Sequence, residues 1–284
     1  MTISVHELQL DDFRGLLKPR AVDAHKGDFG SVGVLGGAPG MVGAALLAGR
    51  SALWTGAGRV FVGMMDSRLA VDPEVPELML CEPARIFALD PPACLAVGPG
   101  LGQSKPAESL LREALQSALP VVLDADALNL IARDPVLQDL VRARATGQTV
   151  LTPHPAEAAR LLACSTDAVQ AGRVQAIEQL VQRFSCVVVL KGAGSLILAP
   201  GAALRQNPTG NPGMATAGMG DVLTGLIAAQ IAQGHSALEA TQLAVYLHGA
   251  AADAAVAAGT GPVGLTASEV AHAARDVLNA WIAT

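Results

Sequence analysis

The stretch from Asn207 to Gln233, NPTGNPGMATAGMGDVLTGLIAAQIAQ, decides the fold of this chain. It begins with turn-forming residues and glycines and ends in an apolar segment with the composition of a buried helix. The change falls at Gly218-Met219-Gly220-Asp221. Glycines let backbone N–H groups converge at a helix start, where the helix dipole adds partial positive charge. The segment therefore predicts a binding site for a phosphate group.

Asp221 falls near the first turn of the predicted helix, beside this anion site. We expect the helix dipole to keep its carboxylate ionised, so that it accepts a proton from a nearby hydroxyl group. An anion site beside a base indicates phosphoryl transfer. The alternative is a glycine-rich turn in which the aspartate only stabilises the helix N-terminus.

Length and composition indicate a single domain with a core of small side chains. The 284 residues are 51% hydrophobic but only 3% aromatic, so Ala, Val and Leu must fill most of the core. No segment has the composition of a linker, and we expect residues 1–284 to form one domain. A net charge of −6, without a basic run interleaved with aromatic residues, argues against nucleic-acid binding.

The cysteines, the N-terminus and the apolar segments indicate in which cellular compartment the protein is found. Cys81, Cys94, Cys164 and Cys186 are far apart and lack CxxC spacing, so we expect buried thiols in a reducing compartment rather than disulfides or a zinc site. The N-terminal MTISVHELQLDDF is polar and acidic, unlike a signal peptide. The longest apolar stretches are interrupted and too short to span a membrane. We expect a cytoplasmic protein with no membrane partner.

Short apolar runs alternate with helical patterns, which predicts an α/β fold: a mainly parallel sheet with helices on both faces. The predicted strands are Ser31–Leu35, Arg59–Gly63, Leu78–Cys81, Cys94–Val97, Pro120–Leu123, Thr149–Leu151 and Cys186–Leu190, then a hairpin of Leu196–Ala199 and Ala203–Gln206. The predicted helices are Gly43–Trp54, Lys105–Leu119, Gly172–Phe184, Asp221–Gln233, Ala237–Ala258 and Ser268–Ile282, after a short helix and an extended lead-in within residues 1–27. Right-handed crossovers bring the loops after parallel strands to one edge of the sheet, where we expect a crevice.

Two glycine-rich loops and two carboxylates follow predicted strands. Gly36–Gly40 and Gly98–Gly102 place backbone at the sheet edge where ligands bind in open α/β folds. The small residues Gly43, Ala44 and Ala45 after the first loop would let a ligand approach the backbone closely, and close helix–sheet packing is the alternative for them. Asp124 and Asp126 straddle a strand end and are suited to hold a metal or orient a substrate. For both residues, and for Asp126 in particular, capping of the following helix is the alternative.

Three further residues lie at strand ends. His154 is held between two prolines in a rigid turn, which favours a functional role over a structural one. Glu157 falls in the first turn of the next helix, where its charge is compatible with the helix dipole. Lys191 is placed to meet a phosphate or a nucleotide, and its alternative is a solvated lysine in a turn.

Together the motifs resemble a known family. GNPGMATAGMGDVLTGLIAA closely resembles the signature of the ADP-dependent NAD(P)H-hydrate dehydratases, which repair hydrated nicotinamide cofactors and have a ribokinase-like fold. The resemblance continues through HKGDFGSVGVLGG, VGAALLAGRSALWTGAGRV, VGPGLG, VLDADALNL, LTPHPAEAARLL and VVLKG, and covers residues from about 25 to 258. It implies a ribokinase-like three-layer sandwich.

The resemblance also implies roles for individual residues. Asp221 would be the catalytic base and would also contact the substrate. The other residues at the hydrated-nicotinamide site would be Ala45, Gly100, Gly102 and His154. The adenine nucleotide would be held by Lys191, Gly192, Ala193, Gly194, Ser195, Thr209, Asn211, Gly218 and Gly220. Mg²⁺ bridging the nucleotide phosphates is expected, and no residue is assigned as a metal ligand.

The implied activity is dehydration of the S-epimer of hydrated NADH or NADPH, with ADP as co-substrate and AMP and phosphate as products. The resemblance suggests a homotetramer. Many relatives carry a fused epimerase domain, for which residues 1–25 are too few, so we expect a separate epimerase protein in the same pathway. Met41 stands where family members often have an aromatic residue, and we expect weaker stacking there.

Two other functions remain open on the sequence alone. A ribokinase-like kinase for a small molecule such as a vitamin precursor would share the anion site and Asp221. Kinases of that branch that resemble this chain tend to have Asn where His154 stands, which favours the dehydratase. A non-catalytic nucleotide sensor would not need Asp221. A stable phosphorylated product would identify the kinase, and absence of any nucleotide turnover would identify the sensor.

Overall fold

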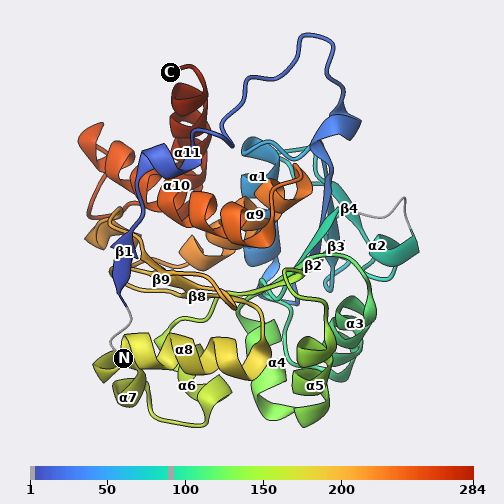
Figure 1. Ribbon diagram of the computed structural model, residues 1–284. Coiled ribbons are helices and arrows are strands. Elements are labelled where there is room, and N and C mark those ends of the chain that lie inside the picture. Colours follow the sequence, from blue (N-terminus) through green and yellow to red (C-terminus); the bar gives the residue numbers. More distant parts are fainter. Residues whose placement is uncertain (1–3, 89–92) are drawn as a thin grey trace.

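The computed structural model describes residues 4–88 and 93–284, and in these ranges ten strands form one sheet (Figure 1). The strand order is β1-β10-β9-β8-β7-β6-β5-β2-β3-β4. Neighbouring strands are parallel except that β9 runs antiparallel to β8 and β10. The strands are β1 (Val5–Glu7), β2 (Ser31–Gly36), β3 (Arg59–Met64), β4 (Met79–Cys81), β5 (Cys94–Val97), β6 (Val121–Leu123), β7 (Thr149–Leu151), β8 (Val187–Leu190), β9 (Leu196–Leu198) and β10 (Leu204–Gln206).

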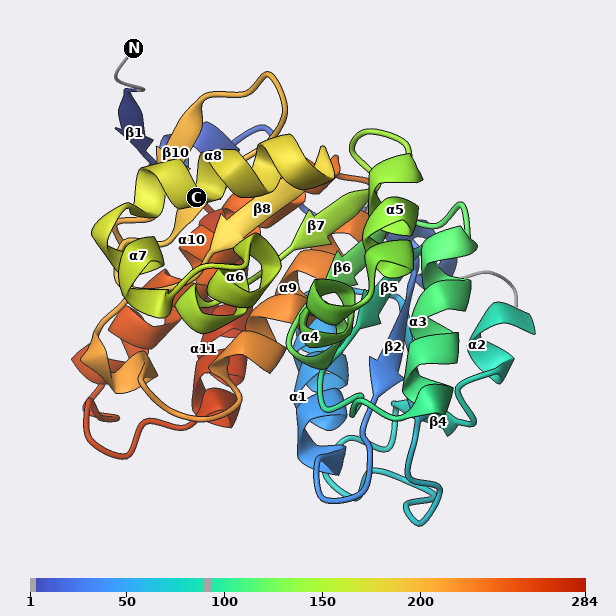
Figure 2. The same cartoon turned by 90° about the horizontal axis from the view of Figure 1, so that it is seen from below.

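Helices cover both faces of the sheet, which confirms the predicted layers (Figures 1 and 2). One face carries α1 (Val42–Trp54), α9 (Met219–Ala232), α10 (Ala237–Ala257) and α11 (Ala267–Ile282). The other carries α3 (Lys105–Gln116), α4 (Asp126–Arg133), α5 (Pro135–Ala143), α6 (Pro155–Leu162), α7 (Thr166–Ala171) and α8 (Arg173–Phe184), and the short α2 (Arg85–Ala88) lies beside β3. Three 3₁₀ turns are Leu10–Phe13, Lys26–Phe29 and Pro212–Met214.

The strands are continuous apolar runs because both faces of the sheet are buried. Along β5, Cys94 and Ala96 belong to the core under α1 and α9, whereas Leu95 and Val97 belong to the core under α3 and α4. Helix α9 packs so closely on α1 that a Cβ at Gly225 would lie 2.1 Å from the carbonyl oxygen of Ala48. Glycine at this position therefore permits the close contact between the two helices.

The carboxyl ends of β2, β5, β6, β7, β8 and β10 lie along one edge, as predicted. Chain order reverses between β2 and β5, and ligands of open α/β sheets bind in the crevice beside such a reversal. The two glycine loops after these strands meet there. The Gly37 N–H donates to the Pro99 carbonyl over 3.1 Å, and the Ala38 N–H donates to the Gly100 carbonyl over 2.6 Å.

The N-terminal segment differs from the predicted short helix and extended lead-in. It contains the edge strand β1, which pairs in parallel with β10, followed by the 3₁₀ turn at Leu10–Phe13. All three residues of β1 are exposed, so its hydrophobic pattern carried no signal, and backbone pairing alone makes it a strand. Residues 1–3 of the predicted segment lie outside the described residues.

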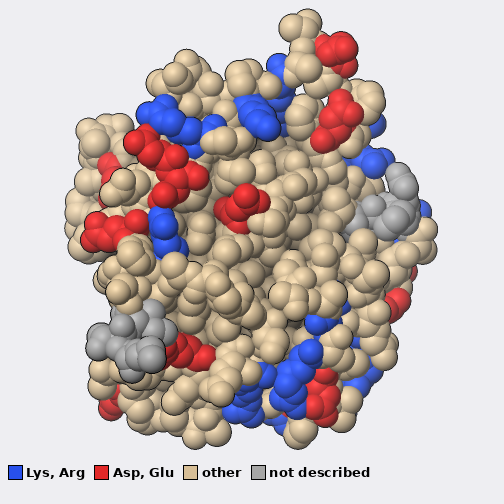
Figure 3. Space-filling view, in the orientation of Figure 1, with Lys and Arg blue, Asp and Glu red and all other residues tan. Residues whose placement is uncertain are grey.

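The four cysteines are free, as predicted, but they are not all buried. Cys164 is exposed because it follows the left-handed turn at Ala163 that ends α6. In the described ranges, no helix has both the length and the apolar character that a membrane-spanning segment requires. Figure 3 shows acidic and basic side chains intermixed on one face, so neither sign of charge dominates it.

Candidate active site

Helix α9 begins without a capping side chain. Its N-cap is Gly218, whose φ of 89° lies in the left-handed region that favours glycine. A Cβ at this position would also lie 2.6 Å from Leu47 Cδ1. Because no side chain caps the helix, its first-turn N–H groups and the positive end of its dipole stay available to an anion. Asp221 lies in this first turn, as predicted.

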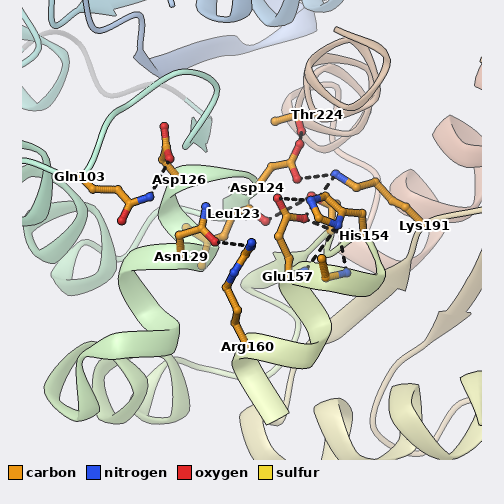
Figure 4. Close-up of polar contacts among 12 residues, drawn as sticks. Gln103, Leu123, Asp124, Asp126, Asn129, His154, Glu157, Arg160, Lys191 and Thr224 are labelled. Atoms are coloured by element: carbon orange, nitrogen blue, oxygen red, sulfur yellow. Dashed lines mark hydrogen bonds and ion pairs between the residues drawn. The ribbon is translucent and has the colours of Figure 1, made fainter. Parts of the chain in front are cut away.

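A buried ion pair lies directly beside the helix start (Figure 4). Lys191, which follows β8, donates from Nζ to Asp124 Oδ1 over 2.6 Å, and Asp124 follows β6. Thr224, one turn into α9, donates to Asp124 Oδ2 over 2.9 Å. A Cβ at Gly220 would lie 3.1 Å from Lys191 Nζ and 3.3 Å from Asp124 Oδ2, so glycine lets the helix start approach this pair.

The surroundings of Asp221 raise the pKa of its carboxyl to about 7, chiefly through burial and then through the nearby charge of Asp124. Lys191 opposes this shift, and Asp126 and Glu157 add to it. This raised pKa runs against the expectation that the position at the helix start keeps the Asp221 carboxyl ionised. A carboxyl with a pKa near 7 is suited to exchange a proton at neutral pH.

His154 is the N-cap of α6, and its Nδ1 accepts from the N–H groups of Ala156 and Glu157 over 3.1 and 3.4 Å. Burial, followed by the charge of Lys191, lowers the pKa of His154. The neutral ring therefore carries its proton on Nε2, which lies 3.2 Å from Glu157 Oε1. About half of the His154 side chain remains exposed to a ligand.

Glu157 does more than complement the dipole of α6. It is 5% exposed, its Oε2 accepts from the His154 N–H over 2.8 Å, and the same oxygen lies 3.9 Å from Lys191 Nζ. Burial, partly offset by Lys191, raises the pKa of Glu157 to about 7. This carboxyl therefore links the His154 turn to the buried ion pair.

A cavity of about 570 Å³ opens beside α9 and the loop after β10. Leu223 and His248, to which the sequence assigned no role, also line it, and His248 lies on α10. His248 Nε2 is buried without a hydrogen-bond partner, and burial followed by the charge of Lys191 lowers the pKa of this ring to about 4. Of the residues predicted to bind the nucleotide, the cavity is lined by Lys191, Gly192, Ala193, Gly194, Ser195, Thr209, Asn211 and Gly220; Gly218 instead forms the turn behind it.

Of the residues predicted to bind the hydrated nicotinamide, Gly100 and Gly102 lie in the loop after β5 and Ala45 lies on α1, whereas His154 follows β7. Gly102 is tied to the site because its N–H donates to Asp126 Oδ2 over 2.9 Å. Ala45 and Gly100 are buried, and a Cβ at Gly100 would lie 2.4 Å from the carbonyl oxygen of Met41. Ala45 thus packs against Gly36 and Gly37 of the first loop, and Gly100 lets the second loop approach Met41.

The alternative in which Asp126 caps α4 does not hold. The N-cap is Ala125, in a strained conformation with φ of 49°, and it makes no side-chain cap. The Asp126 carboxylate points instead to the loop after β5, where it also accepts from Gln103 Nε2 over 3.3 Å (Figure 4). Asp126 thus orients the crevice loop, and its charge acts on Asp221.

Thr224, Leu223 and His248 are among the residues of this region that the sequence did not mark. The first two lie within the apolar pattern of α9, and His248 lies within that of α10. A polar residue inside an apolar helix is the one available signal, and Thr224 and His248 provide it. No local pattern connects them to Asp124 or to the cavity.

The fold and the site define a ribokinase-like α/β protein. The chain belongs to the NAD(P)H-hydrate dehydratase family, whose model matches residues 32–274. A solved ADP/ATP-dependent NAD(P)H-hydrate dehydratase from Bacillus subtilis, co-crystallised with ATP and Mg²⁺, superposes with a TM-score of 0.86 and 29% identity, over 99% of this chain and 100% of that one.

Curated relatives agree with this family. The chain is 42% identical over 271 residues to the ADP-dependent (S)-NAD(P)H-hydrate dehydratase of Neisseria meningitidis, covering 94% of this chain and 91% of that protein. It is 43% identical over 269 residues to a bifunctional NAD(P)H-hydrate repair enzyme of Coxiella burnetii, covering 93% of this chain and 53% of that protein. The chain thus spans about half the length of the bifunctional relatives that it matches.

Proposed function

We propose that this chain catalyses ADP-dependent dehydration of the S-epimer of hydrated NADH or NADPH, which regenerates NAD(P)H and releases AMP and phosphate. One observation carries the proposal: Asp221 lies in the uncapped first turn of α9, directly after Gly220, which lines the cavity. Its charge is coupled to Asp126, which holds the crevice loop at Gly102. The similarity to the N. meningitidis enzyme supports the choice of substrate and donor.

In this proposal ADP occupies the cavity, with its terminal phosphate at the start of α9. The segment from Lys191 to Ser195 and the loop residues Thr209 and Asn211 form the walls, and Gly218 and Gly220 shape the anion site. The buried Lys191 keeps its charge: desolvation lowers its pKa, but the charges of Asp124 and Glu157 outweigh this and raise it overall. A fixed cation beside the helix start favours the phosphate.

The hydrated nicotinamide ring then occupies the crevice between the loops after β2 and β5. Gly102 offers a partly exposed backbone there, and Ala45 packs against Gly36 and Gly37 of the loop after β2. Gly100 keeps the loop after β5 close to Met41, and the neutral His154 offers a half-exposed ring at the end of β7. With ADP on the other side, the Asp221 carboxylate faces the hydroxyl of the substrate. The exposed Met41 provides a flexible apolar contact in place of an aromatic ring.

The chemistry follows from this placement. Asp221 accepts the proton of the ring hydroxyl while the hydroxyl oxygen attacks the β-phosphorus of ADP, and the bond from that phosphorus to the AMP oxygen breaks. First-turn N–H groups of α9 and the ammonium of Lys191 stabilise the charge on the transferring phosphoryl group. The ring nitrogen lone pair then expels phosphate, and the ring carbon next to the one that carried the hydroxyl loses a proton to water, which restores the double bond.

We expect Mg²⁺ to enter with the nucleotide. Among residues 4–88 and 93–284, no group of three or more His, Cys, Asp or Glu side chains is arranged to hold a metal ion. This fits Mg²⁺, which usually retains several waters and is held by substrate phosphates with one or two carboxylates. When bound, it would neutralise charge on the nucleotide phosphates.

The remaining partners stay predictions. A separate epimerase would convert the R-epimer to the S-epimer that this site accepts. We retain the homotetramer and the cytoplasmic location as expectations, to be tested by light scattering and by fractionation.

A turnover assay on hydrated NADH tests the proposal. We expect the absorbance near 340 nm to recover in the presence of Mg²⁺ and ADP, with AMP and phosphate formed in equal amounts. ATP, assayed side by side, measures the donor preference. A stable phosphorylated product without recovery of the reduced cofactor would instead establish a small-molecule kinase, and absence of any nucleotide turnover would establish a nucleotide sensor.

A further inference from the structure

The turn Thr209–Asn211, which lines the cavity, is held by a carboxylate from a distant helix. Asp253 on α10 accepts from the Gly210 N–H at Oδ2 over 2.8 Å and from Asn211 Nδ2 at Oδ1 over 2.9 Å. Both carboxylate oxygens therefore hold adjacent residues of one turn. Gly210 has φ of 107°, a conformation that other residues rarely adopt, so the turn is sharply bent where Asp253 holds it.

Backbone carbonyl groups of α10 also accept hydrogen bonds from the turn and from the residue before it. Thr209 Oγ1 donates to the Tyr246 carbonyl over 2.9 Å. Asn207 Nδ2, just before the turn, donates to the Val245 carbonyl over 3.2 Å. Gly249 permits this approach, because a Cβ there would lie 2.2 Å from Thr209 Oγ1 and 2.6 Å from the Thr209 carbonyl carbon. One wall of the cavity is thus built on α10.

Both ends of the Asn211 side chain are hydrogen-bonded within the protein. Its Nδ2 donates to Asp253, and its Oδ1 accepts from the Gly213 N–H over 3.0 Å at the start of the 3₁₀ turn Pro212–Met214. These two bonds fix the orientation of the amide and leave its second N–H available to a ligand. Asp253 therefore maintains both the shape of the turn and the orientation of Asn211 within it.

We propose that Asp253 is a positioning residue that holds the Thr209–Asn211 turn in the conformation that binds the adenine nucleotide. The inference rests on the proposed function to the extent that this cavity is the ADP site. Asp253 acts through the turn, so its loss should weaken ADP binding and leave the binding of the hydrated nicotinamide unchanged.

Asp253→Asn keeps the shape of the side chain but places an NH₂ group against either the Gly210 N–H or Asn211 Nδ2, where two donors face each other. Loss of one hydrogen bond to a charged group corresponds to a roughly tenfold rise in the Kd of ADP. Gly249→Ala tests the same turn without changing a charge. Alanine strengthens an isolated helix relative to glycine, so an affinity loss in this variant reports displacement of the turn.

The experiment is calorimetric titration of ADP with Mg²⁺ into the full chain, with thermal unfolding of each variant to show that it folds. The matched control is Asp276→Asn on α11, an exposed carboxylate far along the sequence from the turn. We expect Asp253→Asn and Gly249→Ala to raise the Kd of ADP about tenfold, and the control to match the wild type. In turnover, the KM for ADP should rise while the KM for hydrated NADH and kcat stay within about twofold.

Equal ADP affinity in wild type and both folded variants would overturn the inference. An equal rise in both KM values would also overturn it, because that result indicates a general structural defect. Failure of the proposed function gives a different result: the wild type binds ADP but does not restore NADH, and the ADP titrations still decide the role of Asp253. A wild-type protein that does not bind ADP contradicts both.

Discussion

Lys191 Nζ lies 2.6 Å from Asp124 Oδ1 beside the first turn of α9, although the two residues are 67 positions apart in the sequence. The pair joins the ends of β8 and β6, and both side chains are largely buried, with 17% and 1% of their area exposed. Thr224 holds the second oxygen of Asp124. The pair therefore fixes a cation where the proposed phosphoryl group arrives.

Replacement of Lys191 by Met should be costly because it leaves Asp124 buried without its cation. Breaking a buried ion pair from one side typically costs about 3–5 kcal/mol of unfolding free energy. We expect urea unfolding of Lys191→Met to show a loss near the lower value, because Thr224 still donates to Asp124. ADP affinity should fall as well, since the variant also loses the cation at the cavity.

The control for this prediction is the double variant Lys191→Met/Asp124→Asn. A neutral amide at position 124 removes the unpaired charge, so the double variant should be more stable than Lys191→Met alone. ADP affinity should not return, because no cation is restored. A double variant less stable than the single one would show that the charge of Asp124 is compensated by other groups.

Replacement of Asp221 by Asn should separate binding from chemistry. The amide retains the size of the side chain but cannot accept the hydroxyl proton. General-base help is worth about 10²–10⁴-fold, so we expect kcat to fall by ~10²-fold or more while ADP still binds. Turnover of hydrated NADH and calorimetric titration of ADP measure the two quantities, with Asp276→Asn as the control. Turnover close to that of the wild type would remove Asp221 from the role of base.

The rate should depend on pH through the Asp221 carboxyl, whose pKa is raised to about 7. The base acts only when ionised, so kcat/KM should fall by about tenfold per pH unit below pH 7 and level off above it. Glu157 has a pKa raised to about the same value and provides the control. The fall of kcat/KM below pH 7 should persist in Glu157→Gln and disappear in Asp221→Asn. If this fall disappears only in Glu157→Gln, the titrating group that controls the rate is Glu157.

The stability that the Asp221 carboxyl contributes should change with pH in the opposite direction to the rate. The folded-state pKa of Asp221 lies above its ordinary value of 3.8, so the folded chain binds the proton more tightly than the unfolded chain. The resulting stabilisation is complete below about pH 4 and is lost as the pH rises through 7. Asp221→Asn removes this loss, so its Tm should exceed that of the wild type by more at pH 8 than at pH 5. A larger difference at pH 5 would contradict the raised pKa.

Local patterns were sufficient to predict most of the fold. Strands buried on both faces, such as Val187–Leu190, are continuous apolar runs bounded by turn residues, so their existence and order of appearance were predictable. Edge strand β1 was not, because its three residues are exposed and only the partner strand defines it. The short helices α5 and α7 likewise carry too few residues for a clear period.

The site was predictable residue by residue but not in its pairings. Glycines and strand ends marked Gly218, Asp221 and Lys191, because those signals are local. The bonds from Lys191 and Thr224 to Asp124 depend on the strand order β8-β7-β6 and on the packing of α9 against α1. The raised pKa of Asp221 depends on burial and on neighbouring carboxylates, neither of which the helix-start pattern contains.

Two glycines of α9 should respond differently to replacement by Ala. A Cβ at Gly220 would lie 3.1 Å from Lys191 Nζ, which is the far end of a flexible side chain. The Lys191 side chain can therefore move aside while the protein stays folded. Gly220→Ala should therefore lower ADP affinity by about tenfold and leave the unfolding free energy within about 1 kcal/mol of the wild type. Calorimetric titration and urea unfolding measure the two quantities.

Gly225→Ala is the matched variant within the same helix. Its Cβ would lie 2.1 Å from the Ala48 carbonyl oxygen and 2.2 Å from Ser51 Oγ, so α1 and α9 must move apart. Overpacking of this kind costs about 1–3 kcal/mol, which should appear as a lower midpoint in urea. Loss of stability in Gly220→Ala equal to that in Gly225→Ala would show that the helix start is packed as rigidly as the helix–helix contact. In that case Lys191 could not yield, and Gly220 would be required by the fold rather than by the nucleotide.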